Sequence, residues 1–128
     1  MKKTVVLGAS PNPARHSFKA VKSLVRHGHE VVPVGFRPGV IPVAMRPAGV
    51  IEKFIKRGMP EVEGVHTVSL YIGPERQKEY SEYIISLKPE RVIFNPGTIN
   101  EEFMDTLSKL GIETVDGCQL VMLSSDQY

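Results

Sequence analysis

Short apolar runs alternate with longer amphipathic segments along the whole chain. The apolar runs are rich in β-branched residues, and several are nearly continuous in apolar character, as expected of strands that are covered on both faces. Five such runs are present, at residues 4–8, 30–34, 65–72, 91–94 and 112–115. The pattern therefore predicts five strands of a buried sheet.

Between these runs, apolar residues recur at the three- and four-residue spacing of helices. Ser17 and Asn100 are candidate N-caps, and Gly28 and Gly111 suit the left-handed position that follows a helix. The predicted helices cover residues 17–27, 75–88 and 100–110. Strands alternating with helices predict an α/β fold, a Rossmann-like open and mostly parallel sheet of five or six strands with helices on both faces.

The proline-containing segment from Phe36 to Pro60 has the least regular pattern. It predicts a short strand at residues 40–44 and a short helix around residues 51–56. No repeat and no linker divides the chain. We therefore expect one domain covering residues 1–128.

Composition narrows the class of protein. The 128 residues are 41% hydrophobic and 23% charged, and 16 basic against 14 acidic residues leave a net charge of +2. This charge is too balanced to indicate nucleic-acid or anionic-membrane binding. No apolar run approaches the roughly 18 residues of a membrane span, and the run after the basic N-terminus is too short for a signal peptide. We expect a cytoplasmic protein with neither a nucleic acid nor a membrane as partner.

Few residues are candidates for metal binding or redox chemistry. A single cysteine, Cys118, excludes an internal disulfide and a multi-cysteine metal site. His27 and His29 straddle a predicted helix end and have no evident third ligand, so no metal site is predicted. Cys118 follows a predicted strand, where it could exchange with an external thiol or lie buried and inert.

The segment after the first strand has features of a phosphate-binding loop. Gly8 directly after the strand lets backbone amides approach a phosphate, and the following helix offers its positive N-terminal end. Arg15 and Lys19 would add positive charge there. Ser10 stands where the dinucleotide fingerprint has its second glycine, so that fingerprint is absent. The same residues also fit a simple strand-to-helix turn.

The end of the second strand discriminates between nucleotides. A site for NAD carries a carboxylate there, but this chain continues through Gly35 and Phe36 to Arg37, and Glu30 lies at the opposite end of the strand. An arginine suits a phosphorylated ribose, because guanidinium matches phosphate oxygens in a bidentate way. NADP and coenzyme A both carry a phosphorylated ribose and are therefore candidate ligands. Alternatively, Arg37 is a solvated loop residue without a role in binding.

The sequence resembles the family of small CoA-binding-domain proteins, which is similar to the N-terminal nucleotide domain of the succinyl-CoA synthetase α subunit. The resemblance covers nearly the whole chain. It rests on GAS at 8–10, RHSFKAV at 15–21, HGHEVVPV at 27–34, YIGP at 71–74, NPGTINEE at 95–102 and VDGC at 115–118. The chain departs from the family after the second strand, where Gly35-Phe36-Arg37-Pro38 replaces the usual Asn-Pro, and through residue 60.

The resemblance implies roles for residues at the ends of the predicted strands. The phosphates would be cradled by Gly8, Ala9, Ser10 and Asn12, with Arg15, Ser17 and Lys19 at the same helix start. Gly35, Phe36 and Arg37 would lie by the adenosine ribose, with Arg37 near the 3′-phosphate. Tyr71, Ile72, Gly73 and Pro74 would bound the adenine, and Asn95, Pro96, Gly97 and Thr98 would face the pantetheine arm.

No catalytic residues are predicted. The phosphohistidine domain of the synthetases does not occur in these 128 residues, and no Ser-His-Asp or Cys-His arrangement is evident. The leading hypothesis is a protein that binds CoA or acyl-CoA without catalytic activity of its own. A minimal NADP-dependent oxidoreductase and an interaction module with a vestigial nucleotide pocket are the alternatives. A homodimer or a partner subunit stays open.

Overall fold

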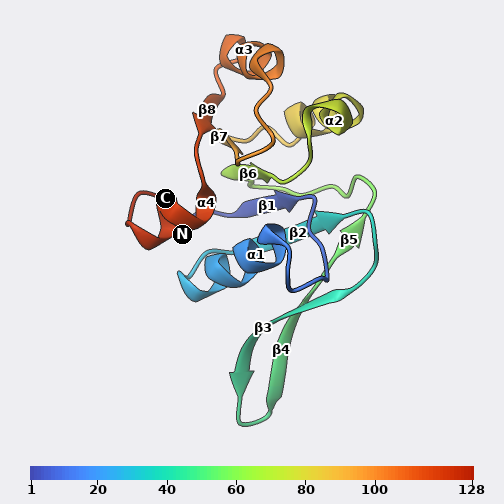
Figure 1. Cartoon of the computed structure of the whole chain (residues 1–128), viewed down its shortest axis with the longest axis vertical. Coiled ribbons are helices and arrows are strands. Elements are labelled where there is room, and N and C mark those ends of the chain that lie inside the picture. The colour runs from blue at the N-terminus through green and yellow to red at the C-terminus, as the bar shows by residue number, and fades with distance from the viewer.

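Six parallel strands form the central sheet of the computed structural model, which describes all 128 residues (Figure 1). The strand order is β5-β2-β1-β6-β7-β8. The strands are β1 (Thr4–Leu7), β2 (Val31–Gly35), β5 (Lys56–Arg57), β6 (Thr67–Leu70), β7 (Arg91–Phe94) and β8 (Glu113–Asp116). The prediction of a Rossmann-like α/β fold is confirmed. The two-residue strand β5 was not predicted, because it has no apolar run of its own.

Helices cover both faces of the sheet. In Figure 1, α1 (His16–Arg26) and α4 (Gln119–Ser124) lie on one side, and α2 (Pro74–Ser86) and α3 (Glu101–Lys109) lie on the other. Neighbouring residues of β1 point to opposite faces, as the pleat requires. Val5 packs in the core under α2 and α3, and Val6 packs in the core under α1 and α4. All residues of β1, β6 and β7 are buried, which shows that these strands are covered on both faces and explains their mostly apolar character.

The proline-containing segment forms an antiparallel hairpin that extends away from the sheet (Figure 1). Its strands are β3 (Val40–Arg46) and β4 (Gly49–Phe54). The predicted helix around residues 51–56 is therefore wrong. These residues alternate between partly buried Ile51 and Lys53 and exposed Glu52 and Phe54, which is the two-residue period of a strand. Pairing with β3 provides hydrogen-bond partners for the backbone N–H and carbonyl groups of β4, whereas a single helical turn would have gained few hydrogen bonds.

The predicted helix ends are mostly correct. Asn100 caps α3, because its Oδ1 accepts a hydrogen bond of 3.1 Å from the backbone N–H of Phe103. Gly28 and Gly111 both have φ of +81°, as predicted for residues that follow a helix. The predicted cap at Ser17 is wrong. Helix α1 already begins at His16, and Ser17 lies inside it and is buried.

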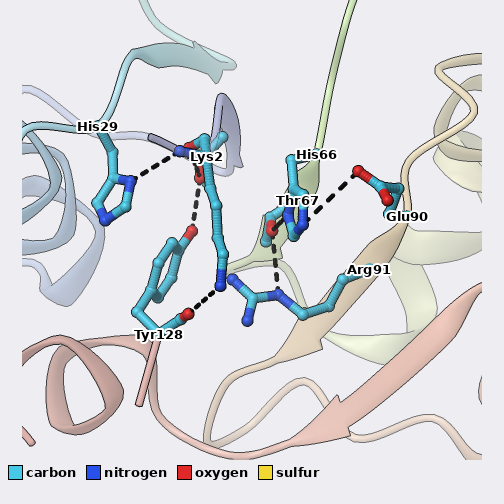
Figure 2. A network of polar contacts seen from close by, with 8 residues as sticks. Lys2, His29, His66, Thr67, Glu90, Arg91 and Tyr128 are labelled. Atoms are coloured by element: carbon cyan, nitrogen blue, oxygen red, sulfur yellow. Dashed lines mark hydrogen bonds and ion pairs between the residues drawn. The ribbon is translucent and has the colours of Figure 1, made fainter. Parts of the chain in front are cut away.

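Tyr128 packs at the amino ends of the strands, within the polar network shown in Figure 2. Its hydroxyl lies 2.5 Å from Thr4 Oγ1, and the Arg91 guanidinium lies 4.4 Å from the centre of its ring. Arg91 Nε also donates to Thr67 Oγ1 at 3.0 Å. The network ties the C-terminal segment to the start of β1, β6 and β7.

No helix of the chain combines the length and the apolar character that a membrane span requires.

The same network predicts that acidification destabilises the fold. His29 Nδ1 accepts a hydrogen bond of 2.9 Å from the backbone N–H of Lys2, so the neutral imidazole is the form that fits (Figure 2). Burial, followed by the positive amino terminus and Lys2, lowers the pKa of His29. Because the unfolded chain then binds protons more readily than the folded one, stability falls as the pH drops below about 6.5. Burial lowers the pKa of His66 as well.

Thermal unfolding between pH 8 and pH 5.5 checks this expectation. The midpoint falls for the wild type and falls less for His29→Asn, because the asparagine amide keeps an acceptor and does not titrate. Part of the fall persists in this variant, since His66 contributes in the same direction. An identical fall in both proteins would contradict the role given to His29.

Candidate functional site

A cavity of about 760 Å³ lies at the carboxyl ends of β1, β2 and β6. Its wall comes from the loop after β1, the residues after β2, and the segment between β6 and α2. In parallel α/β sheets this edge is where ligands bind. The lining residues are Gly8, Ala9, Ser10, Pro11, Asn12, Ala14, Arg15, His16, Ser17, Phe36, Arg37, Tyr71, Ile72, Gly73 and Arg76.

The loop after β1 is held by its own side chains. Ser10 Oγ accepts a hydrogen bond of 3.1 Å from the Asn12 N–H, and Asn12 Oδ1 accepts one of 3.0 Å from the Ala14 N–H. These local bonds are typical of turns that serine and asparagine stabilise. Ser10 and Asn12 therefore shape the loop as well as line the cavity.

The N-terminus of α1 faces the cavity without a side-chain cap. Its N-cap residue is Arg15, whose side chain makes no capping hydrogen bond, and the first turn contains no acidic residue. Arg15, His16 and Ser17 all line the cavity. The free N–H groups and the positive end of the helix dipole thus remain available to an anion.

Two glycines allow the loop after β1 to lie close to neighbouring backbone. Gly8 has φ of +99°, and a Cβ there would lie 2.8 Å from the carbonyl oxygen of Tyr71. A Cβ on Gly35 would lie 2.2 Å from the carbonyl oxygen of Ala9. The N–H groups of Gly8 and Ala9 both donate to the carbonyl of Val34, at 2.8 and 2.9 Å. Glycine at these positions lets the loop fold back over the ends of β1 and β2.

Apart from the phenol of Tyr71, the ionisable side chains of the cavity wall are all basic. Arg15, Arg37 and Arg76 come from three separate segments, and His16 adds a fourth basic group. None of the lining residues is acidic, and none of the three arginines takes part in an ion pair. Glu30 lies at the other end of β2, where it pairs with Lys3 at 3.3 Å. The electrostatics of the cavity therefore favour an anionic ligand.

Tyr71 forms a partly buried side of the cavity. Burial raises the pKa of its hydroxyl well above the ordinary range, with the nearby Cys118 as a second cause. The hydroxyl therefore stays protonated at neutral pH. Cys118 is half-buried, precedes α4 and does not line the cavity.

The structure brings together eleven of the residues that the sequence predicts for the site. They are Gly8, Ala9, Ser10, Asn12, Arg15, Ser17, Phe36, Arg37, Tyr71, Ile72 and Gly73. Gly35 is not part of the wall but packs against the Ala9 backbone. Lys19 lies two residues after Ser17, and Pro74 lies one residue after Gly73. Asn95, Pro96, Gly97 and Thr98 follow β7 and are not part of the wall.

Asn95 and Thr98 take part in internal hydrogen bonds. Asn95 Nδ2 donates to Ser69 Oγ and to the Leu70 carbonyl, both at 2.9 Å, and its Oδ1 accepts from the Gln119 N–H at 2.8 Å. Thr98 Oγ1 donates to the Asn95 carbonyl at 2.8 Å. Both residues are buried, whereas Pro96 and Gly97 between them are exposed. Asn95 thus joins β6, β7 and α4 at the carboxyl edge of the sheet.

Four residues of the wall were absent from the predicted set. Pro11, Ala14 and His16 belong to the predicted loop and lie beside residues that the sequence assigned to the site. Arg76 lies in the first turn of α2. The only signal in the sequence was its position three residues after Gly73, because helices that follow parallel strands begin at the ligand-binding edge.

This fold and cavity define a Rossmann-like α/β protein with a basic site at the carboxyl ends of its strands. The chain belongs to the CoA-binding domain family, whose model matches residues 2–124. No curated protein matches the chain.

Solved structures share the fold over almost the full chain. A crystal structure of an uncharacterised protein is 48% identical, with a TM-score of 0.91, and the match covers 100% of this chain and 98% of that one. A hypothetical protein from Pyrococcus horikoshii OT3 is 27% identical, with a TM-score of 0.73 and coverage of 97% and 82%. A protein from Thermus thermophilus at 20% identity shares the fold, with a TM-score of 0.78 and coverage of 99% and 90%.

Proposed function

We propose that the protein binds CoA or acyl-CoA in this cavity, without catalytic activity of its own. The observation that carries the proposal is the wall itself, where an uncapped helix N-terminus and three unpaired arginines meet with no carboxylate. CoA contains a pyrophosphate and a ribose 3′-phosphate, so its negative charge complements the positive charge of the wall. Membership of the CoA-binding domain family supports the same ligand. The single free cysteine suits the reducing cytoplasm, where we expect the protein to act.

Each part of CoA has a proposed place. The pyrophosphate lies on the loop from Gly8 to Asn12 and on the N-terminus of α1. The 3′-phosphate meets Arg37, and the adenine lies against Tyr71, Ile72, Gly73 and Pro74. The side chains of Asn95 and Thr98 are hydrogen-bonded within the protein. Exposed Pro96 and Gly97 would therefore contact the pantetheine arm.

Thermal unfolding with CoA, acetyl-CoA, 3′-dephospho-CoA, NAD and NADP tests the proposal. CoA at about a hundred times its dissociation constant contributes roughly 2.7 kcal/mol, which raises the midpoint by on the order of 10 °C. The increase should shrink with 3′-dephospho-CoA. An increase with NADP alone would favour the oxidoreductase, since Arg37 also fits a 2′-phosphate. The absence of any increase would overturn nucleotide binding.

The exposed face of the β3–β4 hairpin favours the interaction module as a second candidate. The register places Val40, Pro42, Met45, Val50 and Phe54 on one face, with Glu52 as its charged member. Phe54 is 71% exposed and Met45 is 81% exposed. Since the same face occurs on every copy, two copies could cover each other across a two-fold axis. Self-association together with indifference to every nucleotide would favour this function.

A further inference from the structure

Arg76 stacks on an aromatic ring from a distant part of the chain. Its guanidinium carbon lies 3.9 Å from the centre of the Phe36 ring. Phe36 also meets Tyr80, one turn further along α2, with ring centres 5.7 Å apart and planes inclined by 73°. Tyr80 is buried in the core under α2 and α3. Phe36 thus packs against one side of α2. The Arg76 guanidinium contacts Phe36, which is the neighbour of Arg37 in the sequence.

This stacking leaves the guanidinium of Arg76 able to bind an anion. Contact with a ring uses the flat face of the group, whereas its N–H donors point outward in the plane. Arg76 makes no ion pair, although Glu75 is its neighbour in the sequence. Its side chain lines the same cavity as Arg37. The N–H donors are therefore not engaged by a carboxylate.

A terminal phosphate carries more negative charge than one arginine neutralises. A phosphomonoester carries about −1.5 to −2 charges at pH 7, and each arginine supplies one positive charge. Arg37 follows Phe36 directly, and Phe36 is the residue on which Arg76 stacks. Arg37, from the segment after β2, and Arg76, from the first turn of α2, both line this cavity. Arg15, at the start of α1, lies beside the loop proposed for the pyrophosphate.

We propose that Arg76 is the second arginine of the 3′-phosphate site, together with Arg37, and that Phe36 is the positioning residue that holds it. This inference rests on the proposed CoA site and names a specificity determinant within it. Arg76 and Arg37 together select nucleotides with a phosphorylated ribose. Phe36 acts through Arg76, so its contribution depends on the arginine being present.

Binding of CoA and 3′-dephospho-CoA by calorimetry tests the inference. Arg76→Ala should weaken CoA binding by about tenfold or more and leave 3′-dephospho-CoA within about twofold, because the lost contact is a charge-assisted hydrogen bond. Arg76→Lys should restore only part of the loss, since lysine keeps the charge without the planar fork. Arg46→Ala removes an equivalent exposed charge from the hairpin and should leave the affinity for both ligands unchanged.

Phe36→Leu separates positioning from simple wall contact. It should reduce the preference for CoA in the wild-type background and have little further effect on that preference in Arg76→Ala. Unfolding midpoints without ligand establish that each variant is folded. An equal loss for both ligands in Arg76→Ala, or additive effects of the two substitutions, would overturn the inference. A wild type that binds neither ligand would instead overturn the proposed CoA site.

Discussion

Replacing Gly35 with alanine should lower the free energy of unfolding by about 2 kcal/mol or more, and the unfolding midpoint by roughly 8 °C. The added Cβ would lie 2.2 Å from the carbonyl oxygen of Ala9, which is backbone and cannot rotate away as a side chain would. Relief of this overlap requires the loop after β1 to move from the end of β2. That movement would strain the hydrogen bonds from Gly8 and Ala9 to Val34.

Gly73→Ala provides the matched control for this substitution. Gly73 has φ of −69°, and the only atom that a Cβ at this position would approach is a carboxylate oxygen of Glu75, at 3.9 Å. The substitution should therefore change the midpoint by only a few degrees. Chemical denaturation measures the free energy of unfolding of the three proteins, and thermal denaturation measures their midpoints. Equal stability of Gly35→Ala and the wild type would show that close packing of β2 on the loop is unimportant.

Arg37→Ala should weaken CoA binding by about 1.5–3 kcal/mol, which is roughly 10- to 150-fold. Arg37 is exposed, lies on the cavity wall and makes no ion pair, so its removal should leave the fold intact. The binding of 3′-dephospho-CoA should change little. Calorimetric titration of both ligands into wild type and variant measures the difference.

High salt offers a second check on Arg37. The loss caused by Arg37→Ala should shrink as ionic strength rises, because the contact of an exposed arginine with a phosphate is screened. Arg46→Ala, on the exposed hairpin, controls for the change in net charge. An equal weakening of CoA and 3′-dephospho-CoA would remove Arg37 from the 3′-phosphate site and leave the rest of the cavity assignment in place.

Most of the sheet and three of its helices could be predicted from the sequence. The mostly apolar runs around β1, β6 and β7 reflect burial on both faces, which few other arrangements produce. The hairpin was harder, because the alternation in β4 extends over only a few residues and also fits a short amphipathic helix. Its antiparallel pairing with β3 depends on a partner that local periodicity does not specify.

The candidate site was predictable where it follows directly from the strand ends. Gly8, Arg37 and Tyr71 each come immediately or shortly after a parallel strand, and all line the cavity. Arg76 was missed because its place depends on how α2 packs. Asn95 also follows a strand, but its amide is engaged by β6 and α4. Position at a strand end alone does not determine whether a side chain faces a ligand.

The sequence by itself determined the alternation of strands and helices, the glycine-containing loop after the first strand and the absence of an acid after the second. These features depend on neighbours within a few residues, so local physical chemistry specifies them. Tertiary structure alone decided that Arg76 joins Arg15 and Arg37 in one cavity, and that the Asn95 side chain is hydrogen-bonded within the protein. Such contacts join residues far apart in the chain, and only the packing of helices on the twisted sheet brings them together.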